Sequence, residues 1–447
     1  MHHYVAQPFA ENLRRGIHET ERRIHMKKFL SLMLTLAMLL GMMSISMNAL
    51  AEEPIVIKLS MAASDAEKVS CESAIARFEE KYPNCKVDAE FYAGLSWDEI
   101  IQKQLTQFAS GTYADVVYIA IEGTQLMVNY GLFQPIDDLI EADKDYFSPV
   151  PESAFKAFEV NGKYYEVPFN CNDMCIVYNT KMFQEAGIET PGQWTVEEYL
   201  DALGKIDAYY NKPDTPNSEK VWGVVTGETP YMWAAAYGTS VLNDDWTASN
   251  ITSDAMKEVL QFQYDLVYKY GYSPVRESNT DEVSMFCSNR LATFIAGPYI
   301  LGSLKNNNFT DWDIAIVPRG KENGSAAYGV GGLDMMTGCQ HRQEAFNLMK
   351  EFCSIELSMT QATEATSLPL FEEAANSEAW LAQSPHINVF YDELPNASKL
   401  PSPICYAELN VIMKNMMTNI VTKAMTIDEA VALADQEIAA AYEEFEF

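Results

Sequence analysis

The sequence predicts an α/β protein built as two lobes, and two observations lead to that prediction. The chain has 447 residues, whereas a single hydrophobic core stops growing at about 250–300 residues. Short β-branched runs also alternate with amphipathic stretches of helical length, an order typical of βαβ units and a mostly parallel sheet. With 48% hydrophobic and 21% charged residues, the composition is that of a soluble globular protein.

The first alternation lies between residues 55 and 121. Runs 55–61, 86–92 and 115–121 are β-rich and predict strands. Stretches 66–82 and 97–108 place apolar residues on one helical face and predict helices. The order strand, helix, strand, helix, strand therefore predicts a first α/β unit.

The pattern restarts after the segment 162–179. Capping boxes, Thr195 with Glu198 and Thr426 with Glu429, predict the starts of two helices. The expected elements of this half are helices over about 195–208, 254–270 and 426–443, strands over 221–225, 291–295, 313–317 and 333–337, and surface loops over 211–217 and 395–403.

Residues 26–51 have the order of a secretory signal peptide. A basic start, Met26-Lys27-Lys28, precedes an apolar stretch over 29–43 and the exit Ala49-Leu50-Ala51. The apolar stretch is shorter than the ~20 residues of a bilayer span, although an uncleaved anchor is the alternative. Residues 1–25 are expected to be a non-native upstream extension. The first cysteine is Cys71, so no lipid anchor is expected, and we expect an exported, extracellular or periplasmic protein.

The charge balance excludes nucleic acid as a partner. The chain has 31 basic and 63 acidic residues. Six of the basic and three of the acidic residues precede residue 52, which leaves 25 against 60 and a net charge of −35. Such a chain repels nucleic acid and anionic membrane surfaces, because Lys and Arg drive binding to both.

Catalytic motifs are missing from the sequence. It holds no G-x-S-x-G elbow, no Walker-type phosphate loop and no H-E-x-x-H pair, and its only histidines after residue 51 are His341 and His386. Cys171 and Cys175 have no nearby histidine to complete a zinc set, so we expect no metal site and no cofactor. The many acidic residues leave open the carboxylate pair of a glycosidase.

Aromatic residues are the remaining candidates for ligand contact. The chain has 24 Tyr and 7 Trp, and several stand beside Gly or Pro, where loops are expected. Flat rings stack on the apolar faces of sugars while carboxylates and amides bind the hydroxyls. For any single ring, core packing is the commoner role. The candidates are Trp97 after Gly94, Tyr231 and Trp233 after Pro230, and Tyr299 after Gly297-Pro298.

A series of short segments, taken in order, matches a known family pattern. The segments are Phe78-Glu79-Glu80-Lys81-Tyr82-Pro83 with Val87, Gly111-Thr112-Tyr113-Ala114-Asp115-Val116-Val117, Gly131-Leu132-Phe133-Gln134-Pro135-Ile136, Asn161-Gly162-Lys163-Tyr164-Tyr165-Glu166-Val167-Pro168, Tyr178-Asn179-Thr180-Lys181-Met182-Phe183 with Ala186-Gly187, Trp194-Thr195 with Glu198, Gly297-Pro298-Tyr299, and Thr426-Ile427-Asp428-Glu429-Ala430. Together they resemble the family 1 extracellular solute-binding proteins of ABC importers, a group that includes maltose-binding protein. The similarity spans essentially all of the chain after residue 52.

The resemblance implies a class II periplasmic-binding-protein-like fold with the ligand in the cleft between two lobes. It implies an N-terminal lobe of residues 52–172 and 331–365 and a C-terminal lobe of residues 173–330 and 366–447. It further implies a monomer that captures a sugar by lobe closure and delivers it to the permease subunits of an ABC transporter.

The resemblance also implies binding residues. Glu122 matches a family carboxylate that accepts sugar hydroxyls. Asn172 stands where the maltose binders have an acid, which argues against a maltose-like ligand. Tyr299 replaces the usual Trp of a G-P-W loop and still offers a stacking surface. The remaining implied positions are Ser64 and Asp65 after the first strand, Glu228, Tyr231 and Trp233 in a segment like E-P-Y-x-x-W with Thr229 inserted, Gly332 at the second crossover, and Tyr406 near a late aromatic position.

Two alternatives remain open at this point. The same fold could bind a non-sugar solute such as a peptide, a polyamine or a phosphate ester, because a fold does not fix its ligand. A secreted carbohydrate-active enzyme is the second alternative, and one carboxylate substitution that abolishes turnover of an oligosaccharide would establish it.

Overall fold

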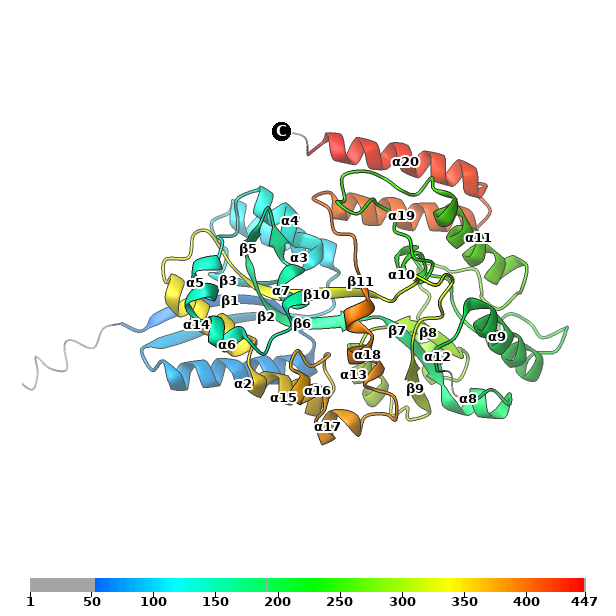
Figure 1. Ribbon diagram of the computed structural model, residues 1–447, viewed down its shortest axis with the longest axis horizontal. Helices are drawn as coiled ribbons and strands as arrows, with labels where there is room; N and C mark the ends of the chain where they lie inside the picture. Colours follow the sequence, from blue (N-terminus) through cyan, green and yellow to red (C-terminus); the bar gives the residue numbers. More distant parts are fainter. Residues whose placement is uncertain (1–52, 190–191, 446–447) are drawn as a thin grey trace, which may run out of the picture. The chain divides into compact units, whose positions relative to one another are not determined.

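The structure, a computed structural model, describes residues 53–189 and 192–445 (Figure 1). The predicted signal peptide and upstream extension lie outside the described residues. Contacts group residues 56–447 into one unit. No helix in the described part of the chain has the length and apolarity needed to cross a membrane.

A six-stranded mixed sheet forms one half of this unit, drawn mainly in blue, cyan and yellow in Figure 1. The strand order is β11-β10-β3-β1-β2, and β6 also pairs with β10. β1 runs parallel to β3, and β10 runs parallel to β11 but antiparallel to β3 and β6. The strands are β1 (Ile55–Ala62), β2 (Cys85–Tyr92), β3 (Val116–Ala120), β6 (Glu166–Asp173), β10 (Ala327–Met335) and β11 (Ser398–Lys399).

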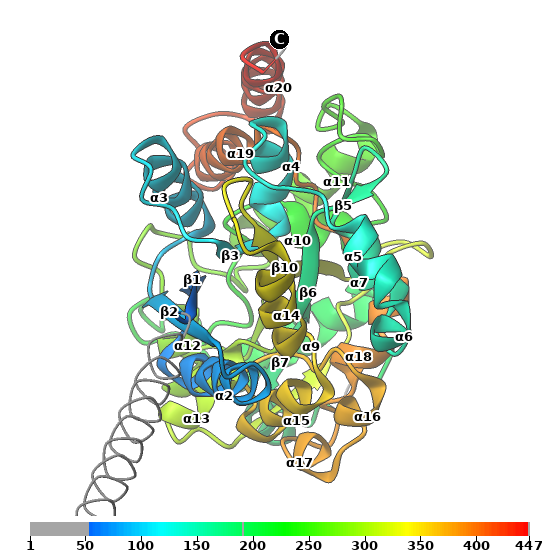
Figure 2. The ribbon, with the colours of Figure 1, turned by 90° about the vertical axis from the view of Figure 1, so that its left-hand side faces the viewer.

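Helices cover both faces of this sheet, so its central strands are buried on both sides. β3 reads Val-Val-Tyr-Ile-Ala and every residue of it is buried, as expected for a strand between two helical layers. Figure 2 shows α2 (Asp65–Lys81), α14 (Arg342–Phe352) and α15 (Ile355–Glu364) on one side and α3 (Trp97–Ala109) and α4 (Ile121–Asn129) on the other.

A second, antiparallel sheet forms the other half. Its central strand β7 (Cys175–Asn179) pairs with β8 (Thr293–Ala296) and β9 (Trp312–Ala315). α8 (Thr180–Glu185), α9 (Val196–Tyr210), α10 (Tyr231–Ala236) and α11 (Asp254–Tyr268) follow β7 along the chain. The C-terminal helices α19 (Tyr406–Val421) and α20 (Ile427–Glu443) pack on each other and on α11.

Three segments connect the two sheets. β6 leads through Met174 directly into β7 (Figure 1). β10 returns to the first sheet after β9, and β11 returns to it before α19. The lobe boundaries expected from the sequence remain a prediction. The other elements are α5 (Asp137–Ala142), α6 (Lys144–Phe147), α7 (Glu152–Lys156), β4 (Glu159–Val160), β5 (Lys163–Tyr164), α12 (Glu282–Cys287), α13 (Ile300–Asn306), α16 (Glu372–Ala375), α17 (Glu378–Leu381), α18 (Val389–Asp392) and a 3₁₀ turn (Leu394–Asn396).

The expectation of a mostly parallel sheet holds for the pairs β1–β3 and β10–β11 but not for the pairs of β10 with β3 and β6 or for the second sheet. The antiparallel pairings arise because β6 and β10 cross between the halves in opposite directions and because β7, β8 and β9 lie in a separate sheet. Residues 221–225 do not form a strand, and only an isolated bridge joins Trp222 to Leu291. Residues 333–337 overlap the end of β10, which begins at Ala327.

The cysteines form no disulfide framework. All eight are free thiols, and all except Cys287 are buried. In the part of the chain that the structure describes, no group of three or more His, Cys, Asp or Glu side chains is placed to hold a metal ion.

Two buried carboxyls lie opposite each other on β6 and β10. Glu166 and Asp334 are register partners, and both side chains are fully buried. The Thr124 hydroxyl donates to Glu166 Oε1, whereas Glu166 Oε2 and both Asp334 oxygens have no hydrogen-bond partner among the described residues. Burial holds the pKa of both carboxyls well above the usual range, and the charge of Glu166 raises the pKa of Asp334 further.

We therefore expect stability to fall as the pH rises above about 4, because the native state keeps carboxyl protons that the unfolded chain releases. Each retained proton should lower the free energy of unfolding by about 1.4 kcal/mol per pH unit until the native-state pKa is reached. Asp334→Asn should make this slope shallower, as measured by urea unfolding at pH 5–8. Asp138 should not titrate in this range, because Arg342 lowers its pKa. Equal slopes for Asp334→Asn and the control Asp138→Asn would contradict this assignment.

Candidate ligand-binding cleft

A cavity of about 390 Å³ lies where the first sheet meets the elements of the second half. β1 and β3 are parallel, and the loops at their carboxyl ends contribute to its wall, as ligand sites in α/β sheets do. The volume is within the range of small-molecule sites, about 300–1,000 Å³. The lining consists of Ala62, Ala63, Ser64, Glu67, Tyr92, Ala93, Gly94, Leu95, Trp97, Ile100, Tyr118, Ala120, Glu122, Asn170, Asn172, Met174, Met232, Tyr299, Tyr328, Gly329, Val330, Gly331 and Leu400.

Aromatic rings contribute to both sides of this cavity. Trp97, at the start of α3, meets Tyr118 of β3 edge to face, with ring centroids 5.5 Å apart. Tyr299 comes from the other half, after β8. Half of its surface is exposed to solvent, at 50%. A Cβ at position 297 would lie 2.9 Å from the Tyr299 ring. Gly297 therefore lets this ring lie close to the backbone, beside the cavity.

Polar side chains in the lining have buried oxygens with no protein partner. Asn170 and Asn172 are two residues apart on β6, so the strand period places both on the same face. Asn170 donates from Nδ2 to the Tyr118 hydroxyl at 3.0 Å, but its Oδ1 and the Oδ1 of Asn172 have no partner in the described structure. Buried polar atoms are normally hydrogen-bonded, so these oxygens are suited to accept hydrogen bonds from a ligand.

Glu122 provides a carboxyl at the start of α4, directly after β3. Burial raises its pKa to about 7, and the charge of Asp98 contributes to the shift. Its Oε2 is buried and has no hydrogen-bond partner among the residues described. Near neutral pH the carboxyl is present in both protonation states, and the neutral acid can donate as well as accept a hydrogen bond.

The charged groups of the lining are all acidic. Glu67 and Glu122 contribute carboxyls, and none of the described residues that line the cavity is Lys, Arg or His. A ligand anion would therefore be buried beside like charges without a cation to pair with, which is costly. The electrostatics therefore argue against an anionic ligand.

The structure brings four of the predicted site residues together. Ser64, Glu122, Asn172 and Tyr299 all line the cavity. Ser64 is also the N-cap of α2: its Oγ accepts from the Glu67 amide and donates to the Glu67 carboxylate at 2.7 Å. That capping box fixes the entry of α2 into the wall of the cavity.

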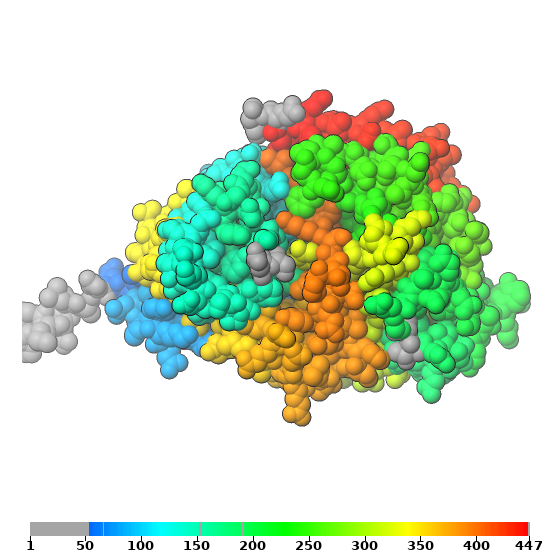
Figure 3. All heavy atoms as spheres, in the orientation of Figure 1, coloured from blue at the N-terminus to red at the C-terminus, as the bar shows by residue number. Residues whose placement is uncertain are grey.

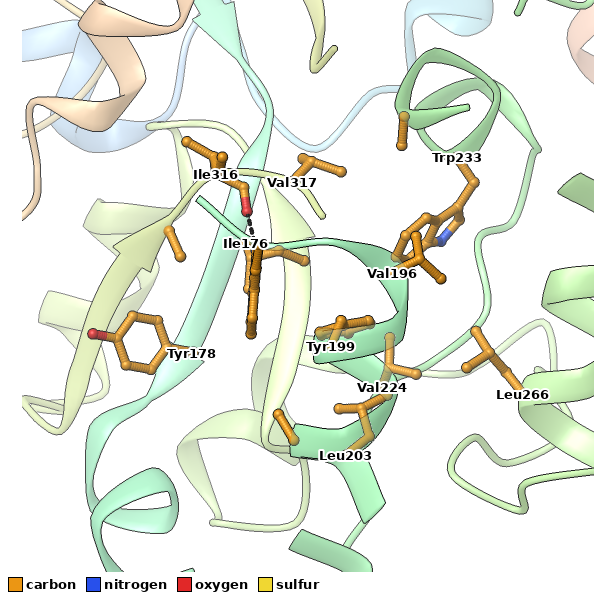
Figure 4. Packing of buried hydrophobic residues seen from close by; sticks show 14 of the residues in the cluster. Ile176, Tyr178, Val196, Tyr199, Leu203, Val224, Trp233, Leu266, Ile316 and Val317 are labelled. Atoms are coloured by element: carbon orange, nitrogen blue, oxygen red, sulfur yellow. Dashed lines mark hydrogen bonds between the residues drawn. The ribbon is translucent and has the colours of Figure 1, made fainter. Parts of the chain in front are cut away.

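Trp233 does not line the cavity. Its side chain is 1% exposed in the core of the second half, where it packs against Phe262 and Tyr199 with ring centroids 4.7 and 5.9 Å away. Figure 4 shows its indole beside Val196 and Tyr199. The helical period of α10 explains this position, because neighbouring residues of a helix face different directions. Met232 lines the cavity, and Trp233 points into the core.

Five further predicted residues also lie outside the lining. Tyr231 and Tyr406 are buried, and their pKa values are raised by burial and by the nearby charges of Asp98 and Glu122, so both lie close behind the cavity wall. The remaining three are Asp65, the exposed first residue of α2, Glu228, which pairs with Lys414 at 3.6 Å, and Gly332, which packs against the buried Glu166.

Several residues that line the cavity were not predicted as site residues from the sequence. Trp97 was only a candidate for ligand contact, and Tyr92, Tyr118, Asn170 and Tyr328 were not considered. A signal existed for Asn170, because it is two residues before Asn172 in the same predicted crossing segment. Tyr118 is inside a continuous apolar strand, where nothing local distinguishes a ligand contact from core packing.

The sequence is similar to known proteins. A family profile described as "Bacterial extracellular solute-binding protein" matches residues 73–389. The maltotriose-binding protein of Pyrococcus abyssi is 26% identical over 281 residues, which cover 61% of this chain and 57% of that protein.

Two solved structures have a similar fold. An ABC substrate-binding protein from Listeria monocytogenes in complex with cycloalternan superposes with a TM-score of 0.77 at 20% identity, covering 87% of this chain and 99% of that chain. A solute-binding protein from Thermotoga lettingae bound with α-D-tagatose gives a TM-score of 0.74 at 20% identity, covering 87% and 99%. The predicted two-lobed, class II binding-protein fold is thereby confirmed.

Proposed function

Because the chain belongs to the bacterial extracellular solute-binding proteins, we propose that it captures a neutral sugar or oligosaccharide in the 390 Å³ cavity and passes it to the permease of an ABC importer. The family binds solutes and does not catalyse reactions, which agrees with the prediction that the chain is no enzyme.

One observation supports a sugar most directly. The cavity combines aromatic rings with buried carboxyl and amide oxygens that have no partner among the described residues, and its described lining includes no cationic side chain. A sugar matches that combination, because its C–H faces pack on rings while its hydroxyls donate to the oxygens. A peptide or a phosphate ester would need a cationic partner for its carboxylate or phosphate, which this lining does not provide.

Two relatives give independent support for a carbohydrate. The Pyrococcus relative is a maltotriose-binding protein, and the Listeria structure contains cycloalternan. By the resemblance, Asn172 stands where the maltose binders have an acid, which argues against a maltose-like sugar.

Lobe closure is the proposed mode of capture. Tyr299 and Met232 belong to the half with the second sheet, whereas Glu122, Asn170 and Trp97 belong to the half with the first sheet. A ligand that contacts both groups binds better to the closed state and shifts the population by that difference in affinity. Small-angle scattering should then show a smaller radius of gyration with the bound sugar, and an unchanged radius would contradict closure.

A thermal-shift screen of the purified protein tests the proposed function. The probes are mono- and oligosaccharides, including maltotriose and arabino-oligosaccharides, with amino acids, spermidine, a dipeptide and glycerophosphocholine as controls. A ligand at 100 times its Kd should add about 2.7 kcal/mol of stability. We expect stabilisation by a neutral saccharide and no turnover of it. Stabilisation only by the controls would overturn the sugar, and turnover would overturn the binding role.

A further inference from the structure

A second cavity, of about 730 Å³, has a lining separate from that of the cleft, and among the described residues none lines both. Where the two cavities adjoin, consecutive residues of the chain line one cavity and then the other. On β10, Tyr328 lines the cleft and Ala327 lines the second cavity; Lys399, the last residue of β11, lines the second cavity, and the next residue, Leu400, lines the cleft. The second cavity is lined by Tyr231, Ala234, Ala235, Gly238, Thr239, Ser240, Val241, Leu242, Asn243, Asp244, Trp246, Asn250, Asn323, Ala327, Ser398, Lys399 and Pro401.

Lys399 is a half-buried cation without an anionic partner. The Lys399 ammonium lies 4.7 Å from the centroid of the Trp246 ring, and among the described residues it makes no ion pair or hydrogen bond. Burial lowers its pKa to about 8, although the charges of Glu166 and Glu159 oppose that shift. In a chain with 63 acidic and 31 basic residues, a cation that pairs with no carboxylate is available to an external anion.

Trp246 is held in a backbone conformation that bulky residues seldom adopt. Its φ is +58°, in the left-handed region that favours Gly or Asn. The loop fixes it there: the Trp246 amide donates to the Asn243 carbonyl at 3.0 Å, and the Asn243 side-chain oxygen accepts from the Thr247 and Ala248 amides. A smaller residue would form this turn at lower cost; the indole packs against the hydrophobic cluster that includes α19 and α20, and it also lies beside Lys399.

The other polar groups of this cavity suit hydroxyls. Asp244 and Asn323 are exposed members of the same lining, and the carboxylate and amide oxygens accept from hydroxyl groups. In Figure 3 the orange chain that leads to β11 is exposed between the cyan atoms and the green and yellow atoms. Asp244 and Asn323 are themselves open to solvent.

We propose that the second cavity binds a small hydroxylated anion, with its carboxylate or phosphate at Lys399 and its carbon skeleton against Trp246. The site is distinct from the cleft and goes beyond the proposed sugar capture. Its charged side chains also differ from those of the cleft: the described lining contains the cation Lys399, which has no ion-pair partner, and one carboxylate, Asp244, whereas the described charged groups of the cleft are both carboxyls. A sugar acid and a sugar phosphate both have this chemistry.

Isothermal titration of the purified protein with D-glucuronate and with D-glucose 6-phosphate tests the site, with D-glucose as the neutral probe. We expect one of the two anions to bind, and the one that does identifies its anionic group. Lys399→Met should weaken that binding at least tenfold and Lys399→Arg should largely preserve it. The matched control Lys205→Met removes an exposed lysine that pairs with Asp201 on α9 and should change nothing.

Two further readouts separate this site from the cleft. Because the pKa of Lys399 is about 8, only about one molecule in ten keeps the ammonium at pH 9, so anion affinity should fall about tenfold from pH 7. Tyr299→Ala, in the cleft, should leave anion binding unchanged. The proposal is overturned if neither anion binds, if Lys399→Met binds like the wild type, or if Tyr299→Ala abolishes binding. None of these results would alter the sugar screen.

Discussion

Trp233→Ala is expected to destabilise the protein by about 3–5 kcal/mol while the folded fraction keeps its sugar affinity. The indole is 1% exposed and packs edge to face on Phe262, so its removal leaves a cavity in the core. Urea unfolding measures the loss of stability, and calorimetric titration of the sugar found in the screen measures the affinity.

Trp233→Phe is the matched control and should cost less, because it keeps a ring at the contact with Phe262. Unchanged stability together with a large loss of affinity in Trp233→Ala would place the indole in the ligand site and contradict the core position.

Tyr299→Ala is expected to show the opposite pattern. The residue is 50% exposed and lines the cleft, so its loss should change stability little but remove a stacking surface. Aromatic residues that anchor a ligand typically contribute about 2 kcal/mol, which corresponds to a loss of affinity of about 30-fold. Calorimetric titration measures this loss.

Two variants control for this effect. Tyr299→Phe keeps the ring and should retain most of the affinity, and the remaining loss reports on the hydroxyl. Tyr130→Ala removes a tyrosine of similar exposure, 46%, that does not line the cleft, and it should bind like the wild type. If Tyr299→Ala and Tyr130→Ala bind equally well, the stacking role is wrong.

Sequence patterns predicted the elements whose signals are local. The capping boxes at Thr195 and Thr426 open α9 and α20 as expected, because the box depends on residues only three positions apart. β10 was predicted too short, since Gly329, Gly331 and Gly332 weaken a strand signal. A Cβ at position 331 would lie 2.4 Å from the Tyr118 hydroxyl, so the reason for that glycine is a close tertiary approach, which the local sequence does not reveal.

The site was predicted only in part, for a related physical reason. Glu122, Asn172 and Tyr299 were found through family segments, and the cleft contains all three. Trp233 and Met232 are neighbours in sequence but face the core and the cleft, respectively. The choice between them depends on the rotation of α10 against the second sheet, which side chains distant in sequence determine. Lys399 falls in a segment predicted only as a loop, and its significance depends on Trp246, more than 150 residues earlier.

A crystal structure with the saccharide found in the screen tests the central claim most directly. We predict density for the sugar in the 390 Å³ cavity, with hydroxyls within hydrogen-bond distance of Glu122 and Asn172 and a ring face against Tyr299 or Trp97. A sugar bound elsewhere, or bound in this cavity without contact to Glu122 and Tyr299, would contradict the account.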